Sequence, residues 1–204
     1  MTDLVLHEYT PSGNCWKIRQ TAALAGRAIV RREYNIVAGD TRTPDFLATV
    51  NANGRIPVLQ VGDRFLPESN AACVYLAEGT ALIPADAFDR ADMLRWMFWE
   101  QYNHEPNVAT LRFWTGWIGI DNLSPLQTAQ LDAKRSGGDD ALALMDRHLA
   151  DRDWFVGPAP TLADIVLYPY TARAGEGGFD LTRYPAVRAW LDRVGHLPGH
   201  VTFG

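Results

Sequence analysis

Apolar positions in the first eighty residues form short clusters separated by polar turns, whereas later clusters keep helical spacing over longer stretches. Short clusters with β-branched members predict strands at residues 4–7, 28–35, 56–61 and 64–66. Helical spacing predicts helices at residues 15–25, 43–51 and from 69 onward. A strand–helix–strand passage favours a parallel pair, and the turn at Gly62-Asp63 favours an antiparallel hairpin. The predicted order is therefore βαβ-α-ββ-α.

The pattern changes around residues 80–87, where Gly79 and Pro84 interrupt the apolar spacing. The seven tryptophans mark the same division, because only Trp16 precedes it. We therefore expect an α/β domain at residues 1–80 and an all-helical domain at residues 87–204.

Helical spacing in the second half begins at Asp86 and continues to Ile118, with Pro106 expected to kink the helix. Three local signals follow: Ser124-Pro125 as a helix start, Gly137-Gly138 as a weak point, and Thr161-x-x-Asp164 as a capping pattern. A last helix is expected at residues 184–191.

Composition narrows the function classes. The formal net charge of −5 argues against a nucleic-acid partner, which favours a basic surface. No apolar run reaches the ~18 residues of a membrane span, and the polar start at residues 1–10 does not resemble a secretory signal. Cys15 and Cys73 are too few for a disulfide framework, which favours a reducing, cytoplasmic location.

The candidate chemistry lies in the stretch from Ile56 to Ser69. Ile56-Pro57 opens an apolar strand, where proline predicts a cis peptide in a tight turn and leaves the Ile56 backbone available to an extended ligand. Ser69 suits a helix N-cap, where free N–H groups attract a carboxylate, and Glu68 beside it can hold an ammonium group. These three features describe a receptor for a small peptide-like zwitterion.

This combination resembles the glutathione-binding half of the glutathione S-transferase family, and the resemblance continues through Thr161-x-x-Asp164 over nearly all the chain. It implies a thioredoxin-like first domain, an all-α second domain and glutathione as co-substrate. By the same resemblance, glutathione is bound by Thr41, Arg55, Ile56, Pro57, Glu68 and Ser69. The family is usually dimeric, so the resemblance also implies a homodimer.

The loop at residues 9–14 should face this site, because ligands sit at the carboxyl ends of parallel strands. The resemblance implies that Ser12 activates the thiol of glutathione, with Asn14 assisting. A hydrogen-bond donor stabilises a thiolate, and the start of a helix adds positive potential. Ser12 could instead be an ordinary turn or capping serine. Cys15 could be a nucleophile at the first turn of the helix or a small buried hydrophobe.

The helix after residue 86 carries the electrophile site in the resembled family. Tyr102, Glu105 and Arg112 are the candidates, although aromatics at helical spacing are more often core. His104-Glu105 lacks a second histidine at Val108, so no metal is expected. The predicted function is conjugation of glutathione to a hydrophobic electrophile. A glutathione-dependent disulfide or peroxide reductase and a non-catalytic glutathione-binding or ligand-carrying protein remain alternatives.

Overall fold

The computed structural model describes residues 3–203, which form two compact units. One unit runs up to Ile83 and includes the segment from Pro198, and the other is Pro84–Leu197. The ranges predicted from the sequence, 1–80 and 87–204, differ from these units chiefly at the C-terminal segment. Each unit is described by itself below.

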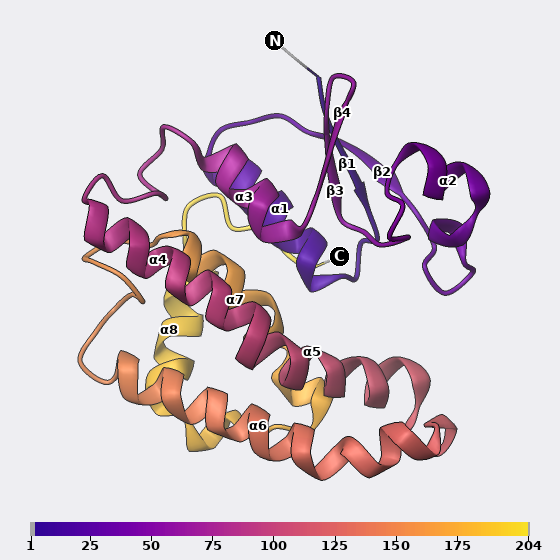
Figure 1. The fold of residues 1–204 in the computed structure, drawn as a ribbon. Helices are drawn as coiled ribbons and strands as arrows, with labels where there is room; N and C mark the ends of the chain where they lie inside the picture. Colours follow the sequence, from indigo (N-terminus) through magenta and orange to yellow (C-terminus); the bar gives the residue numbers. More distant parts are fainter. Residues whose placement is uncertain (1–2, 204) are drawn as a thin grey trace. The chain divides into compact units, whose positions relative to one another are not determined.

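The first unit contains a four-stranded sheet and three helices (Figure 1). Its elements are β1 (Leu4–Glu8), α1 (Gly13–Leu24), β2 (Val30–Glu33), α2 (Pro44–Thr49), β3 (Val58–Val61), β4 (Arg64–Pro67) and α3 (Ser69–Ala77). The strand order is β2-β1-β3-β4, with β1 and β2 parallel and the other pairs antiparallel. The predicted order βαβ-α-ββ-α is confirmed, and so is the hairpin at Gly62-Asp63.

The core of this unit forms where α1 and α3 pack together beside the sheet (Figure 1). Leu6 of β1, Ile18 of α1, Leu59 of β3 and Leu76 of α3 are fully buried. This packing brings the first turn of α1 close to the first turn of α3, which is the end of the unit that carries the candidate site.

The C-terminal segment belongs to the first unit because it lies along α1. Trp16 Nε1 donates to the carbonyl oxygen of Val201 at 2.7 Å, and Val201 N donates to Gln20 Oε1 at 2.7 Å. The Trp16 ring also contacts the rings of His200 and Phe203. Two stretches far apart in the sequence therefore build one hydrophobic cluster.

The second unit is helical, with the elements α4 (Ala87–Trp99), α5 (Glu105–Phe113), α6 (Pro125–Leu149), α7 (Leu162–Ala172) and α8 (Pro185–Gly195). Two π-helical turns, η2 (Glu100–His104) and η3 (Trp114–Ile118), flank α5, and the short 3-10 turn η5 (Ala174–Gly177) follows α7. Pro106 lies in the first turn of α5, directly after η2. The interruption expected at this proline therefore takes the form of a π turn, which absorbs a missing backbone donor.

Both predicted helix starts in this unit are capping boxes. Ser124 Oγ accepts from Gln127 N while Ser124 N donates to Gln127 Oε1. Thr161 N donates to Asp164 Oδ2 at 2.9 Å at the start of α7. Local sequence alone specifies such caps, so these predictions are confirmed.

The expected weak point at Gly137-Gly138 is wrong, because α6 runs through it without interruption. A Cβ atom at Gly138 would lie 2.2 Å from the Phe179 ring, and one at Gly137 would lie 2.8 Å from Asn107. These glycines therefore allow close packing against α6. No helix within residues 3–203 combines the length and apolar character required to cross a membrane.

Candidate functional site

The residues predicted to hold a ligand come from four segments of the first unit. The starts of α1 and α3 meet directly, since Ser69 Oγ donates to Asn14 Oδ1 at 3.3 Å. These two side chains are 55 residues apart in the sequence. The structure thus brings the loop before α1 together with the Glu68-Ser69 pair, as the sequence predicted.

Ser12 is the N-cap of α1. Its backbone is extended, with φ −72° and ψ 127°, and its Oγ accepts from Cys15 N at 3.4 Å. A serine oxygen that accepts a hydrogen bond keeps its own hydrogen for donation. Ser12 can therefore cap the helix and donate to a ligand at the same time. The capping role and the thiol-activating role, which the sequence allowed as alternatives, are compatible.

Ile56-Pro57 is a cis peptide bond, as predicted. The antiparallel ladder between β1 and β3 begins at Val58, so the Ile56 backbone lies beyond the paired part of the strand. Pro57 is buried and Ile56 is half-buried. This placement fits the expected main-chain docking position at Ile56.

Glu68 has φ +70°, and it is the one non-glycine residue with a positive φ among residues 3–203. Such a conformation is costly for a residue with a Cβ atom and is concentrated at functional sites. Glu68 occupies the N-cap position, so the expectation that Ser69 is the N-cap is wrong by one residue. Ser69 is instead the first residue of α3, where its backbone N–H points toward the helix start.

Thr41 and Arg55, expected at the glycine end of glutathione, lie on neighbouring segments. Thr41 is buried in the 3-10 turn η1 (Asp40–Arg42), and its carbonyl oxygen would be 3.0 Å from a Cβ atom at Gly54. Arg42 Nη1 donates to the carbonyl oxygen of Asn53 at 3.2 Å. Arg55 follows Gly54 directly and is exposed. The turn and the segment before Ile56 are therefore held together.

Cys15 is fully buried and does not suit the role of nucleophile. Burial raises the pKa of its thiol to about 12, although a hydrogen bond from Tyr9 N at 3.4 Å acts in the opposite direction. A thiol with this pKa stays protonated at neutral pH, and the thiolate is the reactive form. Of the two interpretations that the sequence allowed, the structure favours the small buried hydrophobe.

The three candidates for the electrophile site have different surroundings. Tyr102 is 83% exposed, whereas Arg112 is 5% exposed. Arg112 Nε donates to Glu176 Oε2 at 2.6 Å, and Glu105 Oε2 accepts from Gln101 Nε2 at 2.6 Å. Within the described part of the chain these side chains do not form one cluster. Their role remains a prediction.

A buried ionic network that the sequence interpretation missed lies next to the loop that carries Ser12. Glu8, at the end of β1, has no exposed surface and accepts hydrogen bonds from Arg19 of α1 and Arg31 of β2. The signal in the sequence is limited to a glutamate at the end of each of two strands, Glu8 and Glu33. Strand pairing places these residues opposite each other in register.

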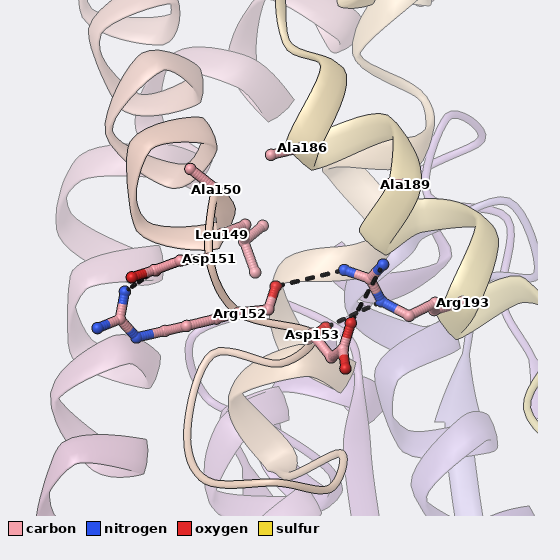
Figure 2. A pocket seen from close by; sticks show the side chains of 8 residues that line it. All are labelled: Leu149, Ala150, Asp151, Arg152, Asp153, Ala186, Ala189 and Arg193. Carbon is pink, nitrogen blue, oxygen red and sulfur yellow. Dashed lines mark hydrogen bonds and ion pairs between the residues drawn. The ribbon is translucent and has the colours of Figure 1, made fainter.

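The second unit has a cavity of about 260 Å³ between the end of α6 and α8, shown in Figure 2. Arg193 lines it, but its Nε and Nη2 donate to the carbonyl oxygens of Asp153 and Arg152, and its Nη1 lies 3.5 Å from Asp153 Oδ1 (Figure 2). These bonds stabilise the loop after α6 rather than offer donors to a ligand. Residues 3–203 contain no group of three or more His, Cys, Asp or Glu side chains suited to a metal ion.

Each half of the chain matches a known family of protein domains. Residues 4–78 match the glutathione S-transferase N-terminal domain, and residues 128–193 match the glutathione S-transferase C-terminal domain. Glutathione S-transferase-like protein LUC7 from a Fusarium species is 30% identical over 197 residues, which cover 93% of this chain and 87% of that protein. The chain therefore belongs to the glutathione S-transferase family, and the predicted fold class is confirmed.

Other relatives carry different names. Maleylacetoacetate isomerase from Pseudomonas aeruginosa is 29% identical, covering 95% of this chain and 92% of the isomerase. Disulfide-bond oxidoreductase YfcG from Escherichia coli is 26% identical, covering 93% of this chain and 89% of YfcG. A crystal structure of a possible glutathione S-transferase from Rhodopseudomonas palustris superposes with a TM-score of 0.92 at 42% identity, covering 98% and 89% of the two chains. The family is thus shown, whereas the reaction differs among its members.

Proposed function

We propose that the protein binds glutathione on its first unit, stabilises the thiolate and conjugates it to a hydrophobic electrophile. The observation that carries this proposal is the convergence of Ser12, Asn14 and Ser69 at the starts of α1 and α3. The positive φ of Glu68 next to them supports a built site rather than two ordinary helix starts.

Glutathione is held by main-chain and polar contacts in this proposal. The Ile56 backbone pairs with the cysteinyl part, and Glu68 with the start of α3 at Ser69 holds the γ-glutamyl end. Thr41 and Arg55 take the glycine carboxylate. Arg55 is exposed and its guanidinium can reach a carboxylate, whereas Thr41 fixes the turn beside it.

The chemical step needs an ionised sulfur. A free thiol has a pKa of ~8.5, so little thiolate exists at neutral pH without stabilisation. Ser12 Oγ donates a hydrogen bond to the sulfur, Asn14 assists, and the start of α1 adds positive potential. The thiol proton passes to solvent water. The thiolate sulfur then forms a bond to the electrophilic carbon, and the electrons of the broken bond leave with the displaced group.

The electrophile is proposed to lie against the helix formed by α4, η2 and α5, with Tyr102 and Glu105 as the contact residues. Arg112 is the weakest of the three candidates, because Glu176 already holds its guanidinium. A homodimer in the cytoplasm completes the proposal, in keeping with the resemblance to the family.

The test is turnover of a panel of aryl halides and peroxides by the wild type and by Ser12→Ala. Loss of one preorganised donor to a developing anion should lower kcat about 100-fold. Ser136→Ala, an exposed serine within α6, is the matched control and should keep wild-type turnover. Unchanged turnover in Ser12→Ala would remove Ser12 from the proposed role.

A second candidate is a glutathione-dependent disulfide reductase, favoured by the similarity to YfcG. An isomerase is a third, favoured by the similarity to maleylacetoacetate isomerase. Reduction of a model disulfide with negligible conjugation would identify the first, and isomerisation without net consumption of glutathione the second. Glutathione binding by tryptophan quenching without any turnover would indicate a non-catalytic binding protein.

A further inference from the structure

We propose that Thr10 is a positioning residue for catalysis, because it locks the loop that presents Ser12. This inference rests on the proposed function of Ser12. The backbone N–H and the hydroxyl of Thr10 bond residues of β2, and its carbonyl oxygen accepts from a residue of α1. Its role is to fix where the Ser12 hydroxyl lies, not to touch the substrate.

The bonds to Glu33 hold Thr10 against the end of β2. Thr10 N donates to Glu33 Oε1 at 2.6 Å, and Thr10 Oγ1 donates to Glu33 Oε2 at 2.8 Å. Both oxygens of one carboxylate are thus used on a single residue. Hydrogen bonds to an ionised acceptor are roughly twice as strong as neutral ones, so this clamp is strong for a surface loop.

Two arginines complete the clamp from the other side. Arg31 Nη2 donates to Thr10 Oγ1 at 2.7 Å, and Arg19 Nη2 donates to the carbonyl oxygen of Thr10 at 2.9 Å. Both guanidinium groups also bind the buried carboxylate of Glu8. One carboxylate and two guanidinium groups therefore bond Thr10 itself, and the same guanidinium groups connect it to Glu8 of β1.

One backbone hydrogen bond and one hydrogen bond to sulfur connect the residue before Thr10 with Ser12 and the first turn of α1. Tyr9 N donates to Cys15 Sγ at 3.4 Å, and Ser12 N donates to the carbonyl oxygen of Tyr9 at 2.9 Å. The loop thus has one fixed residue, Thr10, between two bonds that close it on the start of α1. Since a misplacement of 1 Å can cost about 100-fold in rate, such a clamp two residues from Ser12 has a direct catalytic consequence.

The hydroxyl of Thr10 is the part to remove, because it alone links Arg31 to Glu33. Thr10→Val keeps the shape and both backbone bonds but loses the two bonds of Oγ1. Thr10→Ser keeps the hydroxyl and is the rescue variant. Thr49→Val is the matched control, since Thr49 is exposed on α2 and its Oγ1 bonds only within that helix, to Asp45 O at 2.7 Å.

In Thr10→Val we expect kcat to fall about 10-fold and the KM for glutathione to change less than about twofold. The pKa of the bound glutathione thiol, followed by thiolate absorbance, should rise by about one unit because Ser12 donates less well. Thr10→Ser and Thr49→Val should keep wild-type values. A merely structural role would lower the amount of folded enzyme without moving the pKa of the bound thiol.

A second measurement tests the clamp without glutathione. In a Cys73→Ala background, Cys15 is the only thiol, and its sulfur lies behind the loop. An aromatic disulfide reagent should label Cys15 at least ~10-fold faster in Thr10→Val than in Thr49→Val, because a freed loop exposes the sulfur more often.

The outcomes separate the two claims. No glutathione binding by the wild type would overturn the proposed function, and faster labelling in Thr10→Val would still establish the clamp. Equal labelling of Thr10→Val and Thr49→Val would overturn the clamp. Normal catalysis with faster labelling would show that the loop is clamped but that catalysis does not depend on it, which overturns the positioning role.

Discussion

Of the buried carboxylates, Glu8 in the first unit and Asp164 in the second are stabilised in opposite ways. Glu8 in the first unit has two guanidinium partners, Arg19 and Arg31. Asp164 in the second unit receives hydrogen bonds from neutral donors only, namely Thr161 N, Thr161 Oγ1, Phe155 N and Trp190 Nε1. Both residues have no exposed surface. The two carboxylates therefore differ in their partners, which are positively charged for Glu8 and neutral for Asp164.

The difference has a consequence for each region. The Glu8 network uses residues that strand pairing brings together, and it ends at the loop beside the candidate site. The Asp164 network begins with residues three apart in the sequence and adds Phe155 and Trp190 around the start of α7. The carboxylate of Glu8, which is paired with guanidinium groups, therefore connects distant elements. The carboxylate of Asp164, which accepts from neutral N–H and O–H groups, stabilises the start of one helix.

The largest expected effect is from Glu8→Gln. Removing the carboxylate leaves Arg19, which is only 6% exposed, without its counter-charge, and breaking one partner of a buried pair costs about 3–5 kcal/mol. Urea unfolding measures the loss in free energy of unfolding. Glu78→Gln, at an exposed position after α3, is the control and should change stability by less than about 0.5 kcal/mol. A loss as small as that of the control would contradict the role given to the ion pairs of Glu8.

A smaller effect is expected from Asp164→Ala. This substitution removes the acceptor of the capping box and of the Trp190 indole, so buried donors lose their partner. We expect a loss of about 2–3 kcal/mol in the free energy of unfolding. Asp132→Ala, an exposed aspartate on α6, is the control. If Asp164→Ala costs more than Glu8→Gln, the comparison between the two carboxylates is reversed.

The smallest effect is the pH dependence that Asp164 contributes to stability. Burial raises the pKa of Asp164 to about 6 from its ordinary 3.8, despite the hydrogen bonds that it accepts. The folded protein therefore holds this proton more tightly, so the stabilisation is complete below about pH 4 and is lost as the pH rises through 6. Between pH 7 and pH 5, the wild type should gain about 1 kcal/mol of stability relative to Asp164→Asn, which does not titrate. Urea unfolding of both proteins at the two pH values measures it, and a constant difference would contradict it.

The same contrast explains what could be predicted from the sequence. The pairs Ser124-Pro125 and Thr161-x-x-Asp164 were predicted correctly because each cap is decided within four residues. Gly137-Gly138 was misinterpreted because Asn107 and Phe179, distant in sequence, require the small residues there. The low helix propensity of glycine predicted an interruption of α6, but tertiary packing against these glycines determines the structure there.

Prediction of the candidate site was uneven for the same reason. The cis bond at Ile56-Pro57 and the meeting of Asn14 with Ser69 followed from a motif and a known strand order. The clamp on Thr10 could not be predicted, because Arg19, Arg31 and Glu33 are ordinary charged residues until the parallel pairing of β1 and β2 sets their register. Tyr102, Glu105 and Arg112 rest on the family resemblance and on helical spacing, and neither decides the surroundings of an individual side chain.

The C-terminal segment along α1 has a practical consequence. An N-terminal fragment that stopped at Ile83 would lack part of its own fold, because Val201 and its neighbours cover Trp16 and bond Gln20 on the helix that begins at Ser12. Excising the first unit for study therefore requires that residues 198–203 be grafted back, for instance by a short linker after residue 83. Removing residues 198–203 from the intact chain would take away the partners of Trp16 and Gln20 and so loosen α1, the helix that Ser12 caps.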